Sequence, residues 1–469
     1  MSEHTAGAEP TTAEGETGLR ASESATRRLG PPYHPRTHAR RRHGKGLLGL
    51  REASAMAIGG MIGGGIFSVL GVTIELAGNL AFAAFLLGGV IAALTAHAYA
   101  RLALHSGRAG GPFTYLREEG HTRPAAWVAW LLIVGYVFAL AVYAFTFGHY
   151  LANALGAPVL VARLAGIGVL GVFVAINLRG VTTSGWTEDV IVFTKLAVLA
   201  GIPLIGISMF SATRIAPLDN QGLLGVFLGA AVIFIAYEGF ELVPYDYDDI
   251  EQPRRTLPRA LYLSVAVVIL VYVAVTLASQ MLLSDQGIIA HKEVAFAIVG
   301  EKALGGFGLW AATVGAVFST SSAINATLFS TARLVRDVSA AGELPAALGR
   351  EHRGLPAAAI LWIAIGGAVF SLLPGITEIV SFGSLTFLLV FGLINLLHAR
   401  HTATPGVDRG LAYLGGGACF AAAVGLVYYL ARSDRPALVM IAACAVVIAA
   451  ARVGFVESRR RAVPSGTGR

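Results

Sequence analysis

Three ionisable side chains lie inside long apolar runs of the chain. Glu238 and Glu241 lie on either side of Gly239 in the run 234–241, and Pro244 follows closely. Carboxylates in such surroundings are costly and usually face a cavity or a partner. If a helix is broken here, unwound main-chain carbonyls would be free to receive an amine. The alternative is a kinked helix whose glutamates pair with a structural arginine or hydroxyl.

Lys195 is the third buried ionisable group, about ten residues into the apolar run that begins near residue 186. At 1.5 Å of rise per residue it lies about 15 Å deep, near the centre of a bilayer. A buried lysine can release its proton, whereas an arginine cannot. Lys195 is therefore a candidate proton carrier, and a permanent structural cation is the alternative.

A glycine-rich stretch interrupts the apolar run at 56–67, with Gly59 and Gly60 followed by three consecutive glycines at 63–65. Each glycine weakens a helix by roughly 1 kcal/mol relative to alanine. If the helix unwinds at 63–65, a new helix begins near Ile66. Its free N–H groups and positive dipole end would bind an anion such as a carboxylate. The alternative is close helix packing through small residues.

The elements that position these groups are apolar stretches of membrane-spanning length. The chain is 55% hydrophobic and 13% charged, with mean hydropathy +0.68, whereas soluble domains carry about 25% charged residues. We expect an all-α integral membrane protein with about twelve spans. They lie near 50–76, 79–104, 124–154, 158–178, 186–210, 222–246, 258–283, 306–333, 356–373, 376–399, 409–431 and 436–456.

The two tails differ from this apolar body. Residues 1–46 are polar and poor in aliphatic side chains, so we expect a disordered tail. Arginines precede the first span and recur in alternate loops and in the tail 457–469. The positive-inside rule then places both termini in the cytoplasm. We expect a multi-pass protein of the cell (plasma) membrane, located in a prokaryotic inner membrane. It would contact the lipid bilayer and would not bind nucleic acid.

Several classes of function lack their sequence signatures. There is no phosphate-binding loop, no zinc-type histidine pair and no nucleophile elbow. We therefore expect no enzyme, no ATP-driven pump, no cofactor and no metal. Cys419 and Cys444 both lie in late apolar spans and are expected to be packing residues.

The two breaks lie five spans apart, and breaks at matching places in two halves of a chain indicate a transport site near the membrane midplane. The motifs around them resemble the amino acid–polyamine–organocation (APC) superfamily of transporters. Four segments within about 46–400 carry the resemblance in the family's order: the first break at 62–67, the loop at 107–115, the second break with its following loop at 237–260, and the pattern at 318–345.

The resemblance implies a leucine-transporter-like 5+5 inverted repeat with discontinuous helices 1 and 6. The repeats would be 47–211 and 212–400, followed by peripheral spans at 401–456. It implies a secondary active transporter of amino acids, of the basic amino acid/proton symporter-like branch with a lysine in span five. A sodium-independent exchanger, a polyamine transporter, and a non-transporting sensor or channel are the alternatives. The oligomeric state is left open.

The resemblance also implies the site. The substrate carboxylate would lie against Gly64, Gly65 and Ile66, beside Gly63. The amine would face carbonyls near Ala57, Ile58, Ile235 and Ala236. Phe234 and Tyr237 would lie near the occlusion gate, and Glu238 and Gly239 would meet the amine and side chain. Protonated Lys195 would join span one to span eight through carbonyls near Gly59 and the hydroxyls of Ser319 or Ser322.

Departures from the family pattern lie near the cytoplasmic gate. Arg101 stands where the family often has glutamate, Gln252 replaces an asparagine, and Pro244 stiffens the inner half of span six. Among weaker candidates, His97 and His149 could shuttle protons. The default interpretation is that each histidine ring is hydrogen-bonded to a neighbouring backbone carbonyl. Tyr136 and Tyr143 have helical spacing, and core packing is their default.

Overall fold

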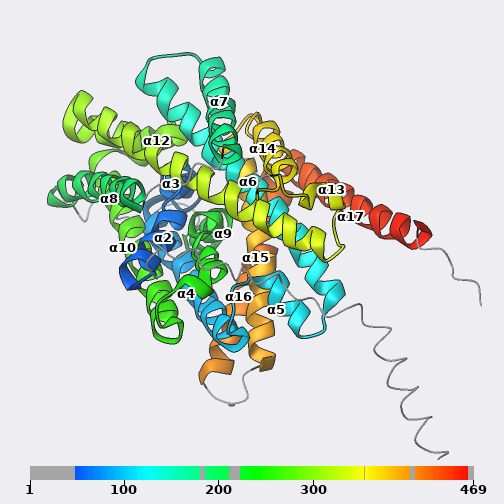
Figure 1. The fold of residues 1–469 in the computed structure, drawn as a ribbon. Helices are drawn as coiled ribbons and strands as arrows, with labels where there is room; N and C mark the ends of the chain where they lie inside the picture. Colours follow the sequence, from blue (N-terminus) through cyan, green and yellow to red (C-terminus); the bar gives the residue numbers. More distant parts are fainter. Residues whose placement is uncertain are drawn as a thin grey trace, which may run out of the picture. The chain divides into compact units, whose positions relative to one another are not determined.

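The computed structural model describes residues 48–179, 185–209, 211, 222–352, 354–401 and 407–462. The tail predicted at 1–46 lies outside the described residues. Within the described ranges the chain is helical, with two isolated β-bridges and no β-strand (Figure 1). The expected all-α fold is confirmed.

The helices follow one another with short connections. In the first half they are α2 (Leu50–Met61), α3 (Gly65–Ala77), η1 (Gly78–Leu80), α4 (Ala81–Ser106), α5 (Pro112–Glu118), α6 (Thr122–Ala154), α7 (Val159–Leu178) and α8 (Gly185–Ser208). In the second half they are α9 (Gly222–Val232), η3 (Phe234–Tyr237), η4 (Phe240–Asp249), α10 (Pro253–Leu282), α11 (Asp285–Ile289), η5 (Lys292–Val294), α12 (Ala295–Ala340), α13 (Ala346–Gly349), α14 (Ala357–Phe370), α15 (Ile376–His401), α16 (Val407–Ser433) and α17 (Arg435–Ala462).

Each of the twelve expected spans has a helical counterpart. Among the described residues, nine helical stretches are long and apolar enough to cross a membrane, and ten if the bent pair α9 and η3–η4 counts as one. The count falls short of twelve for two reasons. The apolar stretch of α3 runs through η1 into α4 as one segment, Gly65–Ser106, and α14 is a shorter apolar helix. The chain is a multi-pass membrane protein.

Helices five spans apart in the sequence pack on one another. The helix α4 contacts α10, α6 contacts α12, and α7 contacts α14, while α2 contacts η4 and α3 contacts α9. These are the second with the seventh span, the third with the eighth, the fourth with the ninth, and the first with the sixth. This arrangement is the one that two interlocked five-span repeats produce.

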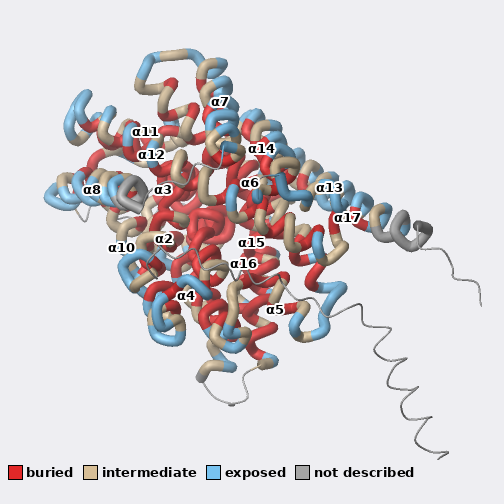
Figure 2. The backbone as a smooth tube through the Cα atoms, viewed as in Figure 1, coloured by how far each residue is buried: buried red, intermediate tan, exposed pale blue. Residues whose placement is uncertain are grey.

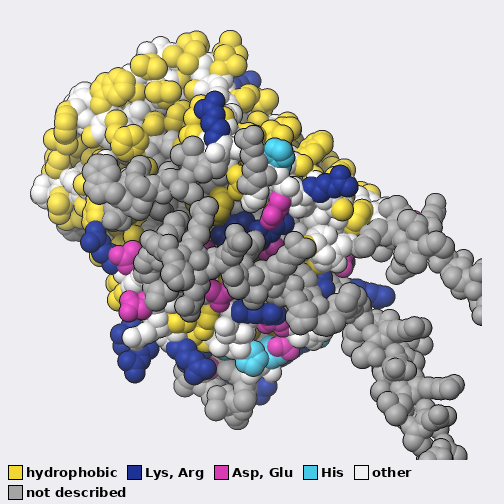
Figure 3. Space-filling view, in the orientation of Figure 1, with side chains coloured by type: hydrophobic (Ala, Val, Ile, Leu, Met, Phe, Trp, Pro, Cys, Tyr) yellow, Lys and Arg dark blue, Asp and Glu magenta, His cyan; other side chains and the backbone are white. Residues whose placement is uncertain are grey.

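The core lies around the broken helices and the helices that enclose them (Figure 2). In the most apolar 18-residue stretch of α15, 78% is buried inside the protein, whereas in that of α17 the share is 11%. Lys195, Glu238 and Glu241 are among the buried side chains. On the face shown in Figure 3, apolar side chains cover the upper part and charged side chains gather below them. An apolar outer surface is what helices in contact with lipid require.

Candidate functional site at two helix breaks

The first break consists of three residues between α2 and α3. The helix α2 ends at Met61, where the Ile62 N–H still bonds to the Ile58 carbonyl oxygen at 2.8 Å, and α3 begins at Gly65. The unwound residues are therefore 62–64, one residue earlier than the predicted 63–65. The N-terminus of α3 points its first N–H groups into this gap.

Close contacts explain why glycines occupy the first break. A Cβ atom on Gly63 would lie 2.6 Å from the Ala323 Cβ, and one on Gly64 would lie 2.5 Å from the Tyr143 ring. Both interpretations of the glycine run, an unwound segment and close packing through small residues, are therefore realised at once.

The second break packs against the last turn of α2, just before the first break, through Gly239 and Gly60. Gly239 has φ +124°, and a Cβ atom on it would lie 2.4 Å from the carbonyl carbon of Gly60. Only glycine adopts such a conformation without strain. Glu238 before it is extended, and the whole segment Phe234–Asp249 is bent by 58° from α9. The predicted break at 234–241 is thus present and lies directly against the first.

The two glutamates of the second break are buried and hydrogen-bonded. The Tyr143 hydroxyl donates to Glu238 Oε2 at 2.7 Å, and the Tyr136 hydroxyl donates to Glu241 Oε1 at 3.3 Å. The Gly239 N–H donates to Glu241 Oε2 at 2.7 Å. Glu241 therefore caps its own break, whereas Glu238 faces the helix α6 beside the first break.

Lys195 on α8 is fully buried and reaches the first break. Its Nζ donates to the carbonyl oxygens of Gly59 and Ile62, each at 2.9 Å. Ser319 on α12 also donates to the Ile62 carbonyl, so that one oxygen joins α8, the first break and α12. The side chain of the half-buried Ser322 makes no hydrogen bond within the described residues.

The remaining predicted residues line these breaks and are closed off from solvent. Ala57, Ile66, Phe234 and Tyr237 are fully buried. Most of the carbonyls predicted to face an amine are already hydrogen-bonded: Ile58 accepts from the Ile62 N–H and Ile235 from the Glu238 N–H. A bound amine would share or replace these bonds, because a carbonyl oxygen has two lone pairs.

Comparison with known sequences decides the family. Residues 48–467 match the sequence profile described as amino acid permease. The chain belongs to the amino acid permease family. The match extends beyond the expected 46–400 through the last two spans. Within the family, this permease is a secondary transporter and not an enzyme, in agreement with the expectation from the sequence.

Two relatives and one solved structure show the extent of the similarity. The permease is 30% identical over 355 residues to an uncharacterized protein of Methanocaldococcus jannaschii, covering 75% of this chain and 82% of the relative. It is 29% identical over 373 residues to the large neutral amino acids transporter small subunit 2 of Mus musculus, covering 75% and 67%. A crystal structure of the Eremococcus coleocola manganese transporter, a mutant, matches with TM-score 0.58 at 12% identity, covering 87% and 93%.

Two polar residues that support the permease's breaks were missed from the sequence. The Tyr272 hydroxyl on α10 lies 2.8 Å from the Met61 carbonyl oxygen and 2.9 Å from that of Ala236, so it joins both breaks. Ser384 on α15 donates to the Val232 carbonyl at 2.6 Å and accepts the Ile235 N–H at 2.9 Å. Both are single polar groups within apolar helices, and no local pattern distinguishes them.

The end of the permease near Gln252 shows how the departures from the family pattern are accommodated. Gln252 has φ +44°, the one non-glycine residue in the described ranges with positive φ. Asparagine adopts this conformation more readily, which explains the residue that the family prefers. Arg101 pairs with Asp408 at 3.1 Å. An open pocket of about 560 Å³ nearby is lined in part by Gln252, Arg254 and Arg255.

The histidines predicted as proton shuttles have different partners. His149 Nδ1 lies 2.8 Å from the Phe145 carbonyl oxygen, as the default interpretation expects. His97 instead lies 2.8 Å from the Tyr262 hydroxyl and 3.5 Å from Asp408.

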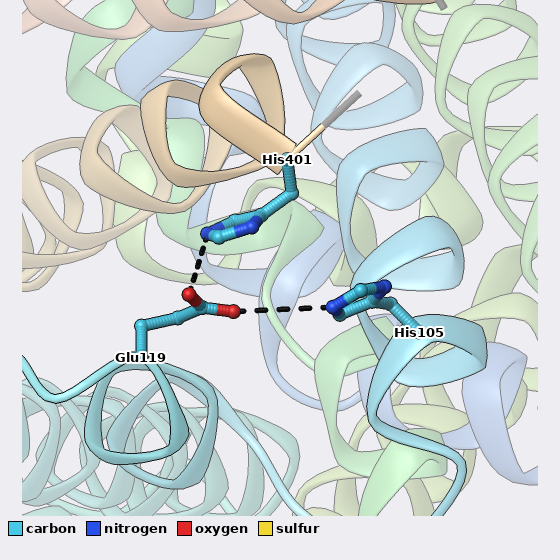
Figure 4. A group of neighbouring side chains, drawn as sticks. All are labelled: His105, Glu119 and His401. Carbon is cyan, nitrogen blue, oxygen red and sulfur yellow. Dashed lines mark ion pairs between the residues drawn. The ribbon is translucent and has the colours of Figure 1, made fainter. Parts of the chain in front are cut away.

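A separate polar cluster joins the ends of α4 and α15. Figure 4 shows Glu119 between His105 and His401, at 3.9 Å and 3.3 Å from their ring nitrogens. One ligating atom of each residue lies within 4.8 Å of the others, a grouping that could also hold a metal ion. The cluster comes from elements other than the two broken helices, and the ion pairs with Glu119 account for its geometry.

Proposed function

We propose that this permease transports amino acids across the cell membrane by alternating access, binding them between the two helix breaks. The close approaches of Gly60 to Gly239 and of Gly65 to Ala236 support this proposal, because they bring the end of α2 and the start of α3 against the second break. The relative from Mus musculus is named for large neutral amino acids. An amino acid offers a carboxylate to the N–H groups of Gly65 and Ile66 and an ammonium group to the second break.

Alternating access requires the breaks to open, because the site is closed in this structure. Glu238 and Ile235 are 1% and 4% exposed. The Tyr143 ring lies against Gly64 and its hydroxyl bonds to Glu238. Movement of this ring, or of α6 as a whole, would open space between the breaks. We assign Phe234 and Tyr237 to the gate, as the family resemblance implies.

We further propose that Lys195 couples transport to protons, and one observation carries this proposal. A fully buried ammonium group donates to two carbonyls of the first break, and one of these also accepts from Ser319 on α12. Charge-assisted hydrogen bonds are roughly twice as strong as neutral ones. Loss of the proton would weaken the attachment of α8 to the first break, so that span one could move.

The test is amino acid uptake into proteoliposomes under an imposed pH gradient. Wild type is expected to accumulate substrate when the outside is more acidic, and Lys195→Ala is expected to lose this accumulation. Lys302→Ala is the matched control, because Lys302 is exposed on α12. Undiminished gradient-driven uptake by Lys195→Ala would overturn the coupling role.

Counterflow without a gradient separates coupling from exchange. If wild type exchanges amino acids but never accumulates them under the gradient, the permease is an exchanger and Lys195 is a structural cation. The cytoplasmic location of both termini and the inner-membrane location remain predictions. Protease accessibility of the termini in oriented vesicles checks the orientation.

A further inference from the structure

The side chain of Glu238 presents an unused acceptor inside the closed site. The residue is 1% exposed, and its Oε2 accepts the Tyr143 hydroxyl at 2.7 Å. Its Oε1 is buried with no hydrogen-bond partner among the described residues. A buried carboxylate oxygen left in this way is costly. The carboxyl groups of Glu238 and Glu241 lie within hydrogen-bonding reach of each other, so a proton shared between them is the contact that the chain itself supplies. A bound cation would replace that proton.

The position of this oxygen relative to the first break is fixed by Tyr143. One edge of the Tyr143 ring lies against Gly64, and its hydroxyl lies on Glu238. The length of one tyrosine side chain thus separates the start of α3 from the Glu238 carboxylate. A solute held by its α-carboxylate at the start of α3 would extend its other groups toward Glu238.

The charge around Glu238 favours a cation as the missing donor. Glu241 lies close enough to interact with it electrostatically. The groups that act on the two glutamates within the described residues are each other, tyrosines and backbone N–H groups, with no lysine or arginine among them. The nearest donors are the phenols of Tyr143 and Tyr136 and one backbone N–H. Two buried carboxyl groups this close cannot both be ionised without a nearby cation, so a bound cation would allow both to carry their charge.

Two further polar groups lie near the glutamates. The hydroxyl oxygens of Tyr99 and Tyr245 are buried without a hydrogen-bond partner in the described part of the chain. Both tyrosines interact electrostatically with Glu241. A guanidinium or ammonium group has several N–H donors for such acceptors.

From these contacts we infer that the preferred solute is an amino acid with a cationic side chain, whose cation binds Glu238 Oε1. This inference rests on the proposed amino acid site. Glu238 is a specificity residue in this account, since the α-carboxylate and α-ammonium are common to all amino acids. A neutral amino acid would leave both acidic groups without a counter-ion.

Calorimetric titration of the purified full chain with arginine and citrulline tests the inference. The two solutes have nearly the same shape, but citrulline has a neutral urea group in place of the guanidinium. Wild type is expected to bind arginine about 30-fold or more tightly than citrulline. Glu238→Gln preserves the shape and the bond from Tyr143, and should reduce this ratio to about one. Glu301→Gln, a change of an exposed acid on α12, should leave the ratio unchanged.

Two outcomes would overturn the inference. Equal binding of arginine and citrulline by wild type would show that the protein does not recognise the side-chain charge. A fall in both affinities with an unchanged ratio in Glu238→Gln would show that Glu238 binds the α-ammonium group instead.

Agmatine, which is arginine without the carboxylate, separates this inference from the proposed function. Weaker binding of agmatine than of arginine supports carboxylate binding at the start of α3. Equal binding of the two would remove that part of the proposed function and leave the role of Glu238 intact. If wild type binds no amino acid in the series, both proposals fail.

Discussion

The two helix breaks differ in what holds them open. In the first, the unwound residues are Ile62 and two glycines. Side chains of other helices hold its carbonyls: Lys195 and Ser319 bond to Ile62, and Tyr272 bonds to Met61 at the end of α2. The second carries its own charged groups, and Glu241 caps the Gly239 N–H. A break without polar side chains of its own can bind a ligand only through main-chain groups. Such a site suits the α-carboxylate, which all amino acid substrates share. A break with its own carboxylates suits recognition of the group in which substrates differ.

Contact between the breaks should be the most sensitive feature to change. Gly239→Ala would place a Cβ 2.4 Å from the Gly60 backbone at a φ of +124°. We expect a loss of stability of about 3 kcal/mol or more, since both strain and overpacking contribute. Thermal melting of the purified protein measures it. Gly107→Ala is the control, because Gly107 has φ +66° with no atom within 4 Å; an equal loss in both variants would mean that the contact contributes nothing.

Removal of the Tyr272 hydroxyl, which bonds to both breaks, should give the second largest loss of stability. The Tyr272 hydroxyl has one proton to share between the Met61 and Ala236 carbonyl oxygens. Tyr272→Phe keeps the ring and removes the hydroxyl, and should cost about 1–2 kcal/mol of stability with a clear reduction of uptake. Melting and uptake should be measured beside Tyr428→Phe, which alters an exposed ring. If both variants behave alike, Tyr272 does not join the breaks.

Two matched serine changes compare the breaks directly, and one of them should give the smallest effect. Ser384→Ala leaves a buried carbonyl at Val232 and a buried N–H at Ile235 without their bonds. Ser319→Ala leaves the Ile62 carbonyl still bonded to Lys195. We therefore expect Ser384→Ala to lower the stability by about 1–2 kcal/mol and Ser319→Ala to lower it by about 1 kcal/mol or less. The reverse order of melting temperatures would contradict this view of how each break is supported.

Local sequence patterns predicted the breaks well. A glycine run marked the first break within one residue, and Gly239 between two glutamates marked the second. The contact of Lys195 with the Gly59 carbonyl came from the family resemblance. Twelve spans followed from hydropathy, although α14 is shorter than a full span. These features depend on the chain within a few residues of each position.

The supports of the breaks could not be predicted in this way. Tyr272 and Ser384 lie on helices distant in the sequence, and their role appears only when α10 and α15 pack beside the breaks. Tyr136 and Tyr143 were expected to be core packing, which their burial agrees with, but their hydroxyls also bond to the two glutamates. A partner chosen by tertiary packing leaves no trace in local spacing.

A structure of the permease with a bound amino acid tests the central claim most directly. We predict that the solute lies between the two breaks, with its carboxylate against the N–H groups of Gly65 and Ile66 and with the Tyr143 ring displaced from Gly64. A solute in the pocket lined by Gln252, Arg254 and Arg255, with both breaks closed as they are here, would contradict the account.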